Sequence, residues 1–156
     1  MRWWLAVIFL VAGCGIQPTD PIDAGEAPTG VSAGVTLYFI DPDGDLVAQQ
    51  RQTGRLGTIP EALSLLLTGP GQSDVHTEIA PTSVVRVEVT VTEEVIELRL
   101  PLSIDDVTPL GIDQIVCTAL AAHVQSGGST STSVRTGFTQ DTPESDVLRF
   151  CPVIGG

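Results

Sequence analysis

The sequence contains no lysine and no asparagine, and its seven arginines face nineteen aspartate and glutamate residues. The formal net charge is -12. A protein that binds nucleic acid needs clustered basic side chains to neutralise phosphates, and no such cluster is present. We therefore expect no nucleic-acid partner, and we expect no electrostatic attraction to anionic lipid headgroups.

Aromatic residues are also scarce, at 4%, and the two tryptophans are Trp3 and Trp4. Most of the chain therefore has no tryptophan that could stack on a sugar ring. Hydrophobic residues nevertheless make up 42% of the chain, which favours a packed core over disorder. At 156 residues, the chain has room for one ordinary domain and a short appendage.

The apolar segment at residues 3–12 is too short for a transmembrane helix, which needs about 20 apolar residues. It follows a short basic start, MR, and ends in VAGC. These features are typical of a secretory signal, and small residues before a cysteine resemble the bacterial lipobox. That resemblance implies cleavage before Cys14 and transfer of diacylglycerol to its thiol. We interpret residues 1–13 as a lipoprotein signal peptide; an ordinary signal peptide, with Cys14 left downstream, is the alternative.

The chain has three cysteines, an odd number. Lipid on Cys14 leaves Cys117 and Cys151 as an even pair outside the cytoplasm, where a disulfide is the default. Metal ligation by these thiols is the competing interpretation, but CxxC spacing is missing and only His76 and His123 are available. We predict the disulfide, no metal and no cofactor. The acyl chains would anchor the protein on the extracytoplasmic face of the cell membrane.

Residues 14–33 mix proline, glycine, aspartate and small residues without a hydrophobic period, which predicts a flexible lipidated tether. Apolar alternation then predicts strands at 35–40 and 46–51. The DPDGD between them has aspartates at alternate positions, as in a calcium loop. Its sixth and twelfth positions are Leu46 and Gln52 instead of glycine and glutamate, so a hairpin turn is favoured.

Capping residues and periodicity predict two helices. Thr58, with Glu61 three residues later, forms a capping box before a helix that ends at the TGPG of residues 68–71. Thr108 precedes a second helix, in which apolar residues recur at i, i+3, i+4 and i+7 through residues 112–124.

Alternating valines predict a strand at 85–92, followed through a tight hairpin by a second strand at 96–100. A last strand is predicted at 134–138. The element order predicts a single α+β domain over residues 34–156, a βαββαβ-like arrangement. Its two helices would pack on one face of a small mixed or antiparallel sheet.

Four segments in this order resemble a known family: ALSLLLTGP at 62–70, TEIAP at 77–81, the valine-rich hairpin, and IDQIVCTAL at 112–120. Together they are similar to the GerMN domain of sporulation and spore-germination proteins, which is common in actinobacterial lipoproteins. The resemblance implies a non-catalytic domain in proteins linked to envelope assembly. The expected partner is another envelope protein or a second copy of the chain. In that family the position of Cys117 is often aromatic, so the predicted disulfide would be a local variation.

No catalytic motif of the GxSxG, HExxH or Cys-His type is visible, so we predict no catalytic residue and no enzyme. The acidic pairs at 93–94 and 105–106 consist of neighbours that point to different sides, which is typical of solvated turns. Gln114 and Thr118, one turn apart on the second helix, are the candidate contact residues. For Gln114 we favour the other interpretation, a hydrogen bond to backbone at the helix–sheet junction.

The leading functional hypothesis is a membrane-anchored, non-catalytic lipoprotein that acts through protein–protein contact. The alternative is a lipoprotein that binds a small ligand or a cell-wall fragment, against which the scarcity of aromatic side chains counts. An envelope hydrolase ranks below both.

Overall fold

The computed structural model describes residues 34–55 and 57–155. They form an α+β fold in which two helices pack against a small sheet, as the sequence predicts. The predicted signal peptide at 1–13 and the predicted tether at 14–33, with Cys14, lie outside the described residues. None of the described helices is long and apolar enough to cross a membrane.

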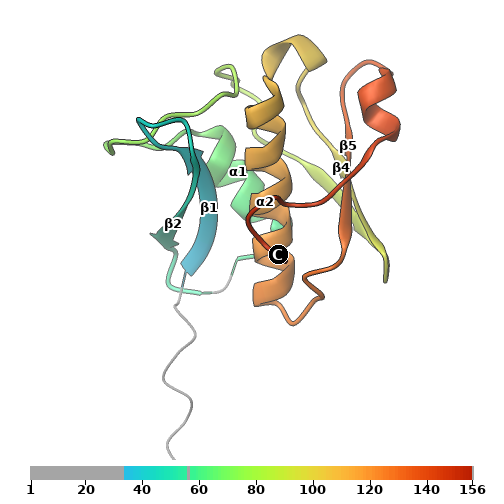
Figure 1. Cartoon of the computed structure of the whole chain (residues 1–156), viewed down its shortest axis with the longest axis horizontal. Coiled ribbons are helices and arrows are strands. Elements are labelled where there is room, and N and C mark those ends of the chain that lie inside the picture. The colour runs from blue at the N-terminus through green and yellow to red at the C-terminus, as the bar shows by residue number, and fades with distance from the viewer. Residues whose placement is uncertain (1–33, 56, 156) are drawn as a thin grey trace, which may run out of the picture. The chain divides into compact units, whose positions relative to one another are not determined.

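The strands are divided between two sheets (Figure 1). An antiparallel hairpin consists of β1 (Gly34–Ile40) and β2 (Leu46–Gln52). The second sheet has the order β3 (Glu88–Val91), β4 (Val95–Arg99), β5 (Ser133–Gly137) and β6 (Leu148–Arg149). In it β4 and β5 are parallel and the outer pairs are antiparallel. Both α1 (Ile59–Leu67) and α2 (Pro109–Gln125) lie between the hairpin and this sheet. Short 3₁₀ turns occupy Ile104–Asp106 and Pro143–Asp146.

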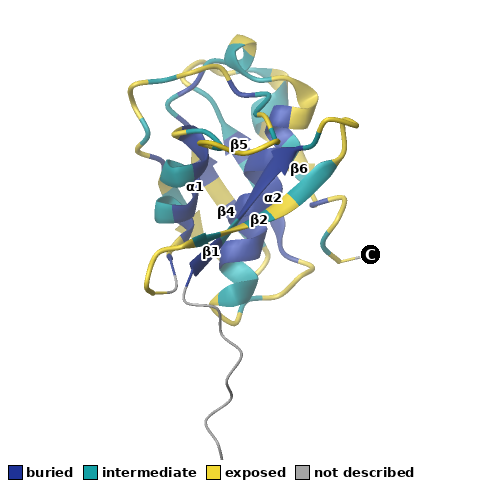
Figure 2. Ribbon diagram, turned by 90° about the vertical axis from the view of Figure 1, so that its left-hand side faces the viewer, coloured by how far each residue is buried: buried dark blue, intermediate teal, exposed yellow. Residues whose placement is uncertain are grey.

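A single hydrophobic core joins the two sheets and the helices. The strand β1 is buried on both faces and is seen in Figure 2 as a dark blue arrow. Its Val35, Leu37 and Phe39 have no exposed surface. Ile96 and Leu98 of β4 close the core from the other sheet, with exposed fractions of 0% and 2%. The strand predicted at 35–40 is therefore present and buried, although it pairs with β2 alone in a two-stranded sheet.

The turn between β1 and β2 is built by Asp41. Its carboxylate accepts hydrogen bonds from the backbone N–H groups of Asp43 at 3.0 Å and Asp45 at 2.8 Å. Gly44 takes a positive φ of 90°, which a residue with a side chain rarely adopts. The alternating aspartates thus form the predicted hairpin turn. No group of three or more metal-ligating side chains occurs in the described part of the chain.

The predicted capping box begins α1. The Thr58 hydroxyl accepts from the backbone N–H of Glu61 at 3.4 Å, and the Glu61 carboxylate accepts from the backbone N–H of Thr58 at 2.9 Å. Glu61 also pairs with Arg55. The backbone hydrogen bond and the neighbouring arginine hold the pKa of Glu61 below its usual value. The helix ends at Leu67 with Thr68 as its C-cap, and Gly69 follows with a φ of 90°.

One strand begins later than predicted. Alternation suggested pairing from residue 85, but β3 pairs with β4 only from Glu88 to Val91. Residues 85–87 make no backbone–backbone hydrogen bond to any residue that the structure describes. Their alternation instead reflects the lining of a groove beside α1.

The C-terminal segment returns to α2 through the predicted disulfide. Cys117 and Cys151 are bonded, their Cα atoms are 4.8 Å apart, and 34 positions separate them in the sequence. Both side chains are buried, with exposed fractions of 0% and 4%. The tail passes in front of α2 in Figure 1 and is held there covalently.

The capping box predicts how stability changes in acid. Because the folded-state pKa of Glu61 lies below its usual value of 4.5, its ionised form stabilises the fold above that pH. This contribution is lost as the pH falls through the lowered folded-state pKa. We expect Glu61→Gln, which keeps an acceptor oxygen but cannot ionise, to weaken the fall in unfolding free energy below pH 4.5. Urea unfolding at a series of pH values measures this, with Glu93→Gln in an exposed turn as the control. Equal pH dependence in both variants would contradict the assignment.

The disulfide predicts a large loss of stability on removal. Closing a loop of 34 positions restricts the unfolded chain and stabilises the fold by about 4 kcal/mol in the chain-entropy model. We expect Cys117→Ala/Cys151→Ala to lower the unfolding free energy by roughly that amount while the far-UV spectrum persists. Urea unfolding measures the change, and the wild-type chain refolded in reductant should match the double variant. An unchanged midpoint would contradict the prediction.

Candidate interaction surface

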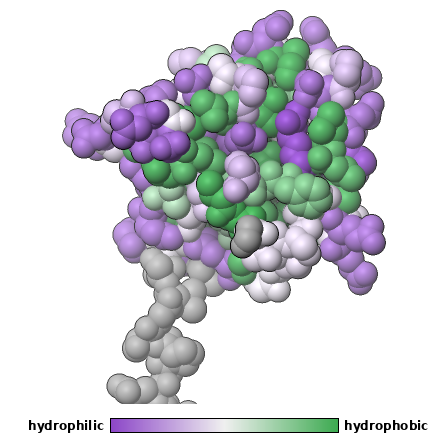
Figure 3. All heavy atoms as spheres, in the orientation of Figure 1, coloured by the Kyte–Doolittle hydropathy of each residue, from purple (hydrophilic) through white to green (hydrophobic). Residues whose placement is uncertain are grey.

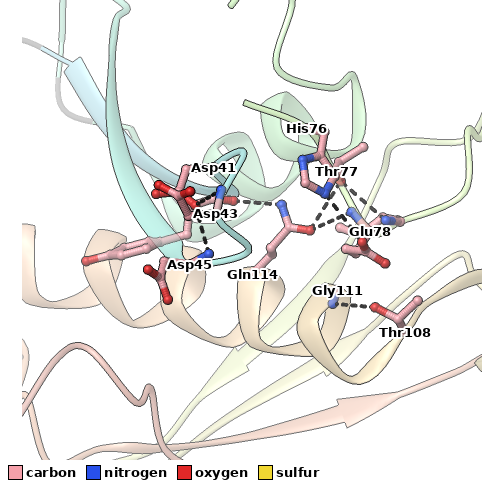
Figure 4. Close-up of polar contacts among 11 residues, drawn as sticks. Asp41, Asp43, Asp45, His76, Thr77, Glu78, Thr108, Gly111 and Gln114 are labelled. Atoms are coloured by element: carbon pink, nitrogen blue, oxygen red, sulfur yellow. Dashed lines mark hydrogen bonds and ion pairs between the residues drawn. The ribbon is translucent and has the colours of Figure 1, made fainter. Parts of the chain in front are cut away.

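The two candidate contact residues are fully buried on the side of α2 that faces β1, and Gln114 is drawn in Figure 4. The Thr118 hydroxyl accepts a hydrogen bond from the backbone N–H of Tyr38 at 3.0 Å. The Gln114 amide group donates to the backbone carbonyl of Tyr38 at 3.0 Å. One edge of β1 pairs with β2, so these side chains take the place of a neighbouring strand at the opposite edge.

Gln114 also holds the segment at residues 76–80. Its carbonyl oxygen accepts from the backbone N–H of Glu78 at 2.8 Å and from the Thr77 hydroxyl at 3.4 Å (Figure 4). The same segment continues the edge of β1, because His76 and Ile40 exchange two backbone hydrogen bonds of 3.0 and 2.8 Å. One buried amide therefore connects a strand, a helix and an irregular segment.

The first turn of α2 is fitted closely to this segment. The Thr108 hydroxyl caps the helix by accepting from the Gly111 N–H at 3.2 Å, and the Thr108 N–H donates to the Glu78 carbonyl at 3.2 Å. A Cβ atom on Gly111 would lie 2.4 Å from that carbonyl oxygen. Only glycine leaves room for this approach. Two of the segments that carry the family resemblance, TEIAP and IDQIVCTAL, meet at this junction.

The junction decides between the two interpretations of Gln114. The side chain bonds backbone at a helix–sheet junction, and neither Gln114 nor Thr118 has any exposed surface to offer a second molecule. Burial also raises the pKa of the neighbouring Tyr38 phenol. The sequence therefore located important residues, and their role is to hold the fold together.

The remaining polar candidates have local roles. Within the acidic pair at 105–106, Asp106 accepts hydrogen bonds from the Ser103 N–H at 2.8 Å and the Ser103 hydroxyl at 2.9 Å. These bonds lower the pKa of Asp106, whereas a general acid needs a raised pKa. The His76 ring lies 3.4 Å from Glu78, and the His123 ring lies 3.2 Å from the Thr132 hydroxyl.

A groove of about 800 Å³ lies beside α1, and we call it the α1 groove. It is lined by residues of α1, of the segment that leads into β3 and of the loop before α1. Its lining residues are Val35, Thr53, Arg55, Gly57, Pro60, Glu61, Ser64, Leu65, Val85, Arg86, Val87 and Glu88. This groove was not predicted from the sequence. The valine alternation that begins at residue 85 is the part of the sequence pattern that arises from it.

The floor of the α1 groove is apolar and its rim is charged. Val35 and Val87 form buried parts of the lining, with exposed fractions of 0% and 4%. The Ser64 hydroxyl donates to the Val85 carbonyl at 2.8 Å, which ties α1 to the segment that leads into β3. The charges of the lining cancel, because two arginines face two glutamates. The described lining residues include the Ser64 hydroxyl and no histidine.

Two other surfaces are weaker candidates. A hollow of about 270 Å³ on the four-stranded sheet is lined mainly by polar residues, including the Glu97–Arg135 ion pair at 2.9 Å. On the face where α2 lies in front, apolar surface gathers at the centre within a polar rim (Figure 3). The C-terminal segment also exposes large apolar side chains, namely Val147, Leu148, Phe150 and Val153. None of these surfaces combines an apolar hollow with unpaired backbone.

Comparisons with models of known protein families, with curated proteins and with solved structures found no match to this chain. The GerMN resemblance thus depends on the four sequence segments alone, two of which meet at the Gln114 junction.

The junction predicts opposite effects for two threonine substitutions of the same shape. Thr118→Val leaves the buried Tyr38 N–H without an acceptor, so we expect a loss of about 1–3 kcal/mol in unfolding free energy. Thr136 is equally buried, but its hydroxyl has no hydrogen-bond partner among the described residues. Thr136→Val should therefore be neutral or stabilising. Gln114→Leu, which leaves groups of both Tyr38 and Glu78 unpaired, should cost more than Thr118→Val. Urea unfolding checks the order, and equal effects of the two threonine substitutions would contradict it.

Proposed function

We propose that this chain is a lipid-anchored, non-catalytic envelope protein of the GerMN type that acts through contact with another protein. The observation that carries the proposal is the bond between Cys117 and Cys151. A buried disulfide is typical of proteins that fold in an oxidising compartment. It supports export, which the N-terminal apolar segment predicts independently.

The same bond singles out Cys14. The chain has three cysteines, so Cys14 has no further cysteine in the chain to pair with. It stands directly after the small residues of VAGC, where lipoprotein processing requires a free thiol. A diacylglycerol there supplies two acyl chains, which anchor stably where a single chain is marginal.

The α1 groove supports contact as the mode of action. Its apolar floor and charged rim match the anatomy of a protein-binding surface. The acidic pairs are placed in turns, and Asp106 has a lowered pKa, so neither feature supports an envelope hydrolase.

One observation favours the second candidate function, the binding of a small ligand. The groove volume of about 800 Å³ is within the range of small-molecule sites. Its lining contains no aromatic residue, however, so a cell-wall sugar has no ring to stack on. A small ligand for this groove would be apolar.

Acylation of Cys14 is tested by the mass and the partitioning of the full chain. Produced in a bacterium that processes lipoproteins, the wild-type protein should begin at Cys14, carry acyl mass and enter the detergent phase of a Triton X-114 separation. Cys14→Ser should lack the acyl mass and retain residues 1–13, because the thiol that lipoprotein processing requires is gone. Thiol counting on the denatured wild type should find no reactive cysteine. A wild-type chain that begins at another residue and stays in the aqueous phase would overturn the proposal.

A further inference from the structure

We propose that the α1 groove binds an extended, basic peptide segment of a partner protein, which adds as a strand to the open edge of β3. The inference takes protein contact from the proposed function and adds the site, the binding mode and the chemistry of the partner. It does not depend on the acylation of Cys14.

The edge of the sheet at β3 has unpaired backbone groups. In the four-stranded sheet β3 is an edge strand, with β4 as its neighbour on one side only. Directly before it, residues 85–87 make no backbone–backbone hydrogen bond within the described part of the chain. The Val85 carbonyl alone is used, by Ser64. A row of unpaired N–H and C=O groups at a sheet edge is the template on which an added strand forms.

The valine side chains along this edge share one side of the sheet. Val89 and Val91 pair with Leu98 and Ile96 of β4, so they face the helix side of the sheet. The alternation continues backward to Val87, which belongs to the groove lining. A strand added to this edge would direct every second side chain toward the α1 groove. An apolar hollow beside unpaired backbone suits an extended peptide, which uses both, better than a small molecule.

The net charge of the chain favours a basic occupant. Without residues 1–13 the chain carries 19 acidic residues and six arginines, a formal charge of -13. A second copy would bring the same charge and be repelled. The predicted tether at 14–33 contains three acidic residues, no basic residue and three prolines, which cannot donate to a strand edge. A second copy and the tether are both acidic, whereas a basic segment of another protein is attracted by the negative charge of this chain.

The test uses the purified full chain, in detergent where it is acylated, and a fluorescent probe peptide with the sequence Arg-Val-Thr-Val-Thr-Val-Arg. We expect saturable binding by anisotropy that weakens as salt is raised. The same peptide with alternate backbone nitrogens methylated keeps its side chains and loses its donors, so its affinity should fall at least tenfold. A peptide with glutamate in place of both arginines should also bind at least tenfold more weakly.

Matched variants locate the site. Glu88→Arg reverses a charge at the groove rim and should weaken binding at least tenfold. Asp43→Arg makes the same change of charge in the exposed β1–β2 turn and should have only a small effect. Leu65→Asp places a charge in the groove wall and should abolish binding, while Leu110→Asp on α2 should not. Circular dichroism checks that each variant is folded. If Leu65→Asp does not fold, the comparison of Glu88→Arg with Asp43→Arg locates the site.

Several outcomes would overturn the inference. They are no binding of the basic peptide, equal binding of the N-methylated peptide, and equal effects of Glu88→Arg and Asp43→Arg. Tighter peptide binding after deletion of residues 15–33 would identify the tether as the occupant. A dimer that dissociates with Leu65→Asp would identify a second copy. Because binding is measured whether or not Cys14 is acylated, this inference and the anchoring proposal can fail separately.

Discussion

The carboxamide of Gln114 is the interaction on which the rest of the fold depends. Three elements that are far apart in the sequence, β1, residues 76–80 and α2, meet at this one side chain. Two of its bonds satisfy backbone groups, the Tyr38 carbonyl and the Glu78 N–H. A buried backbone group without a partner costs more than an ordinary hydrogen bond contributes. With Thr118, Gln114 closes the free edge of a strand that is buried on both faces. This closure lets β1 pair with a single strand and still lie at the centre of the core.

Most local elements could be predicted because their causes are local. The capping box of α1, the Thr108 cap of α2 and the Asp41 turn each involve residues within a few positions of one another. The division of the strands into two sheets could not be predicted in this way. It depends on Gln114 and Thr118 filling the edge of β1, which involves sequence separations of 76 and 80. The two-residue strand β6 is too short to produce a period.

The start of β3 shows why alternation can mislead. Period-two burial reports which way side chains point, and it does not report whether the backbone is paired. Val85 and Val87 alternate because they line the α1 groove, although no backbone of the residues that the structure describes pairs with them. The same ambiguity affected Gln114, since a polar residue in an apolar stripe is expected both at a ligand site and at a buried junction. Only the position of the Tyr38 backbone separates the two.

The segments that resemble the GerMN domain contribute differently to the Gln114 junction and to the α1 groove. TEIAP and IDQIVCTAL supply the Gln114 junction, so a chain that shares them shares a way of joining a strand to a helix. Of the four segments, ALSLLLTGP contributes Ser64 and Leu65 to the α1 groove, and the hairpin contributes its leading valines. Half of the charged rim comes from positions outside the four segments, Arg55 and Glu61, which precede ALSLLLTGP. Resemblance in the junction segments therefore bears on the fold, whereas the partner that we propose would be selected by the residues at the groove rim, which can change without disturbing the junction.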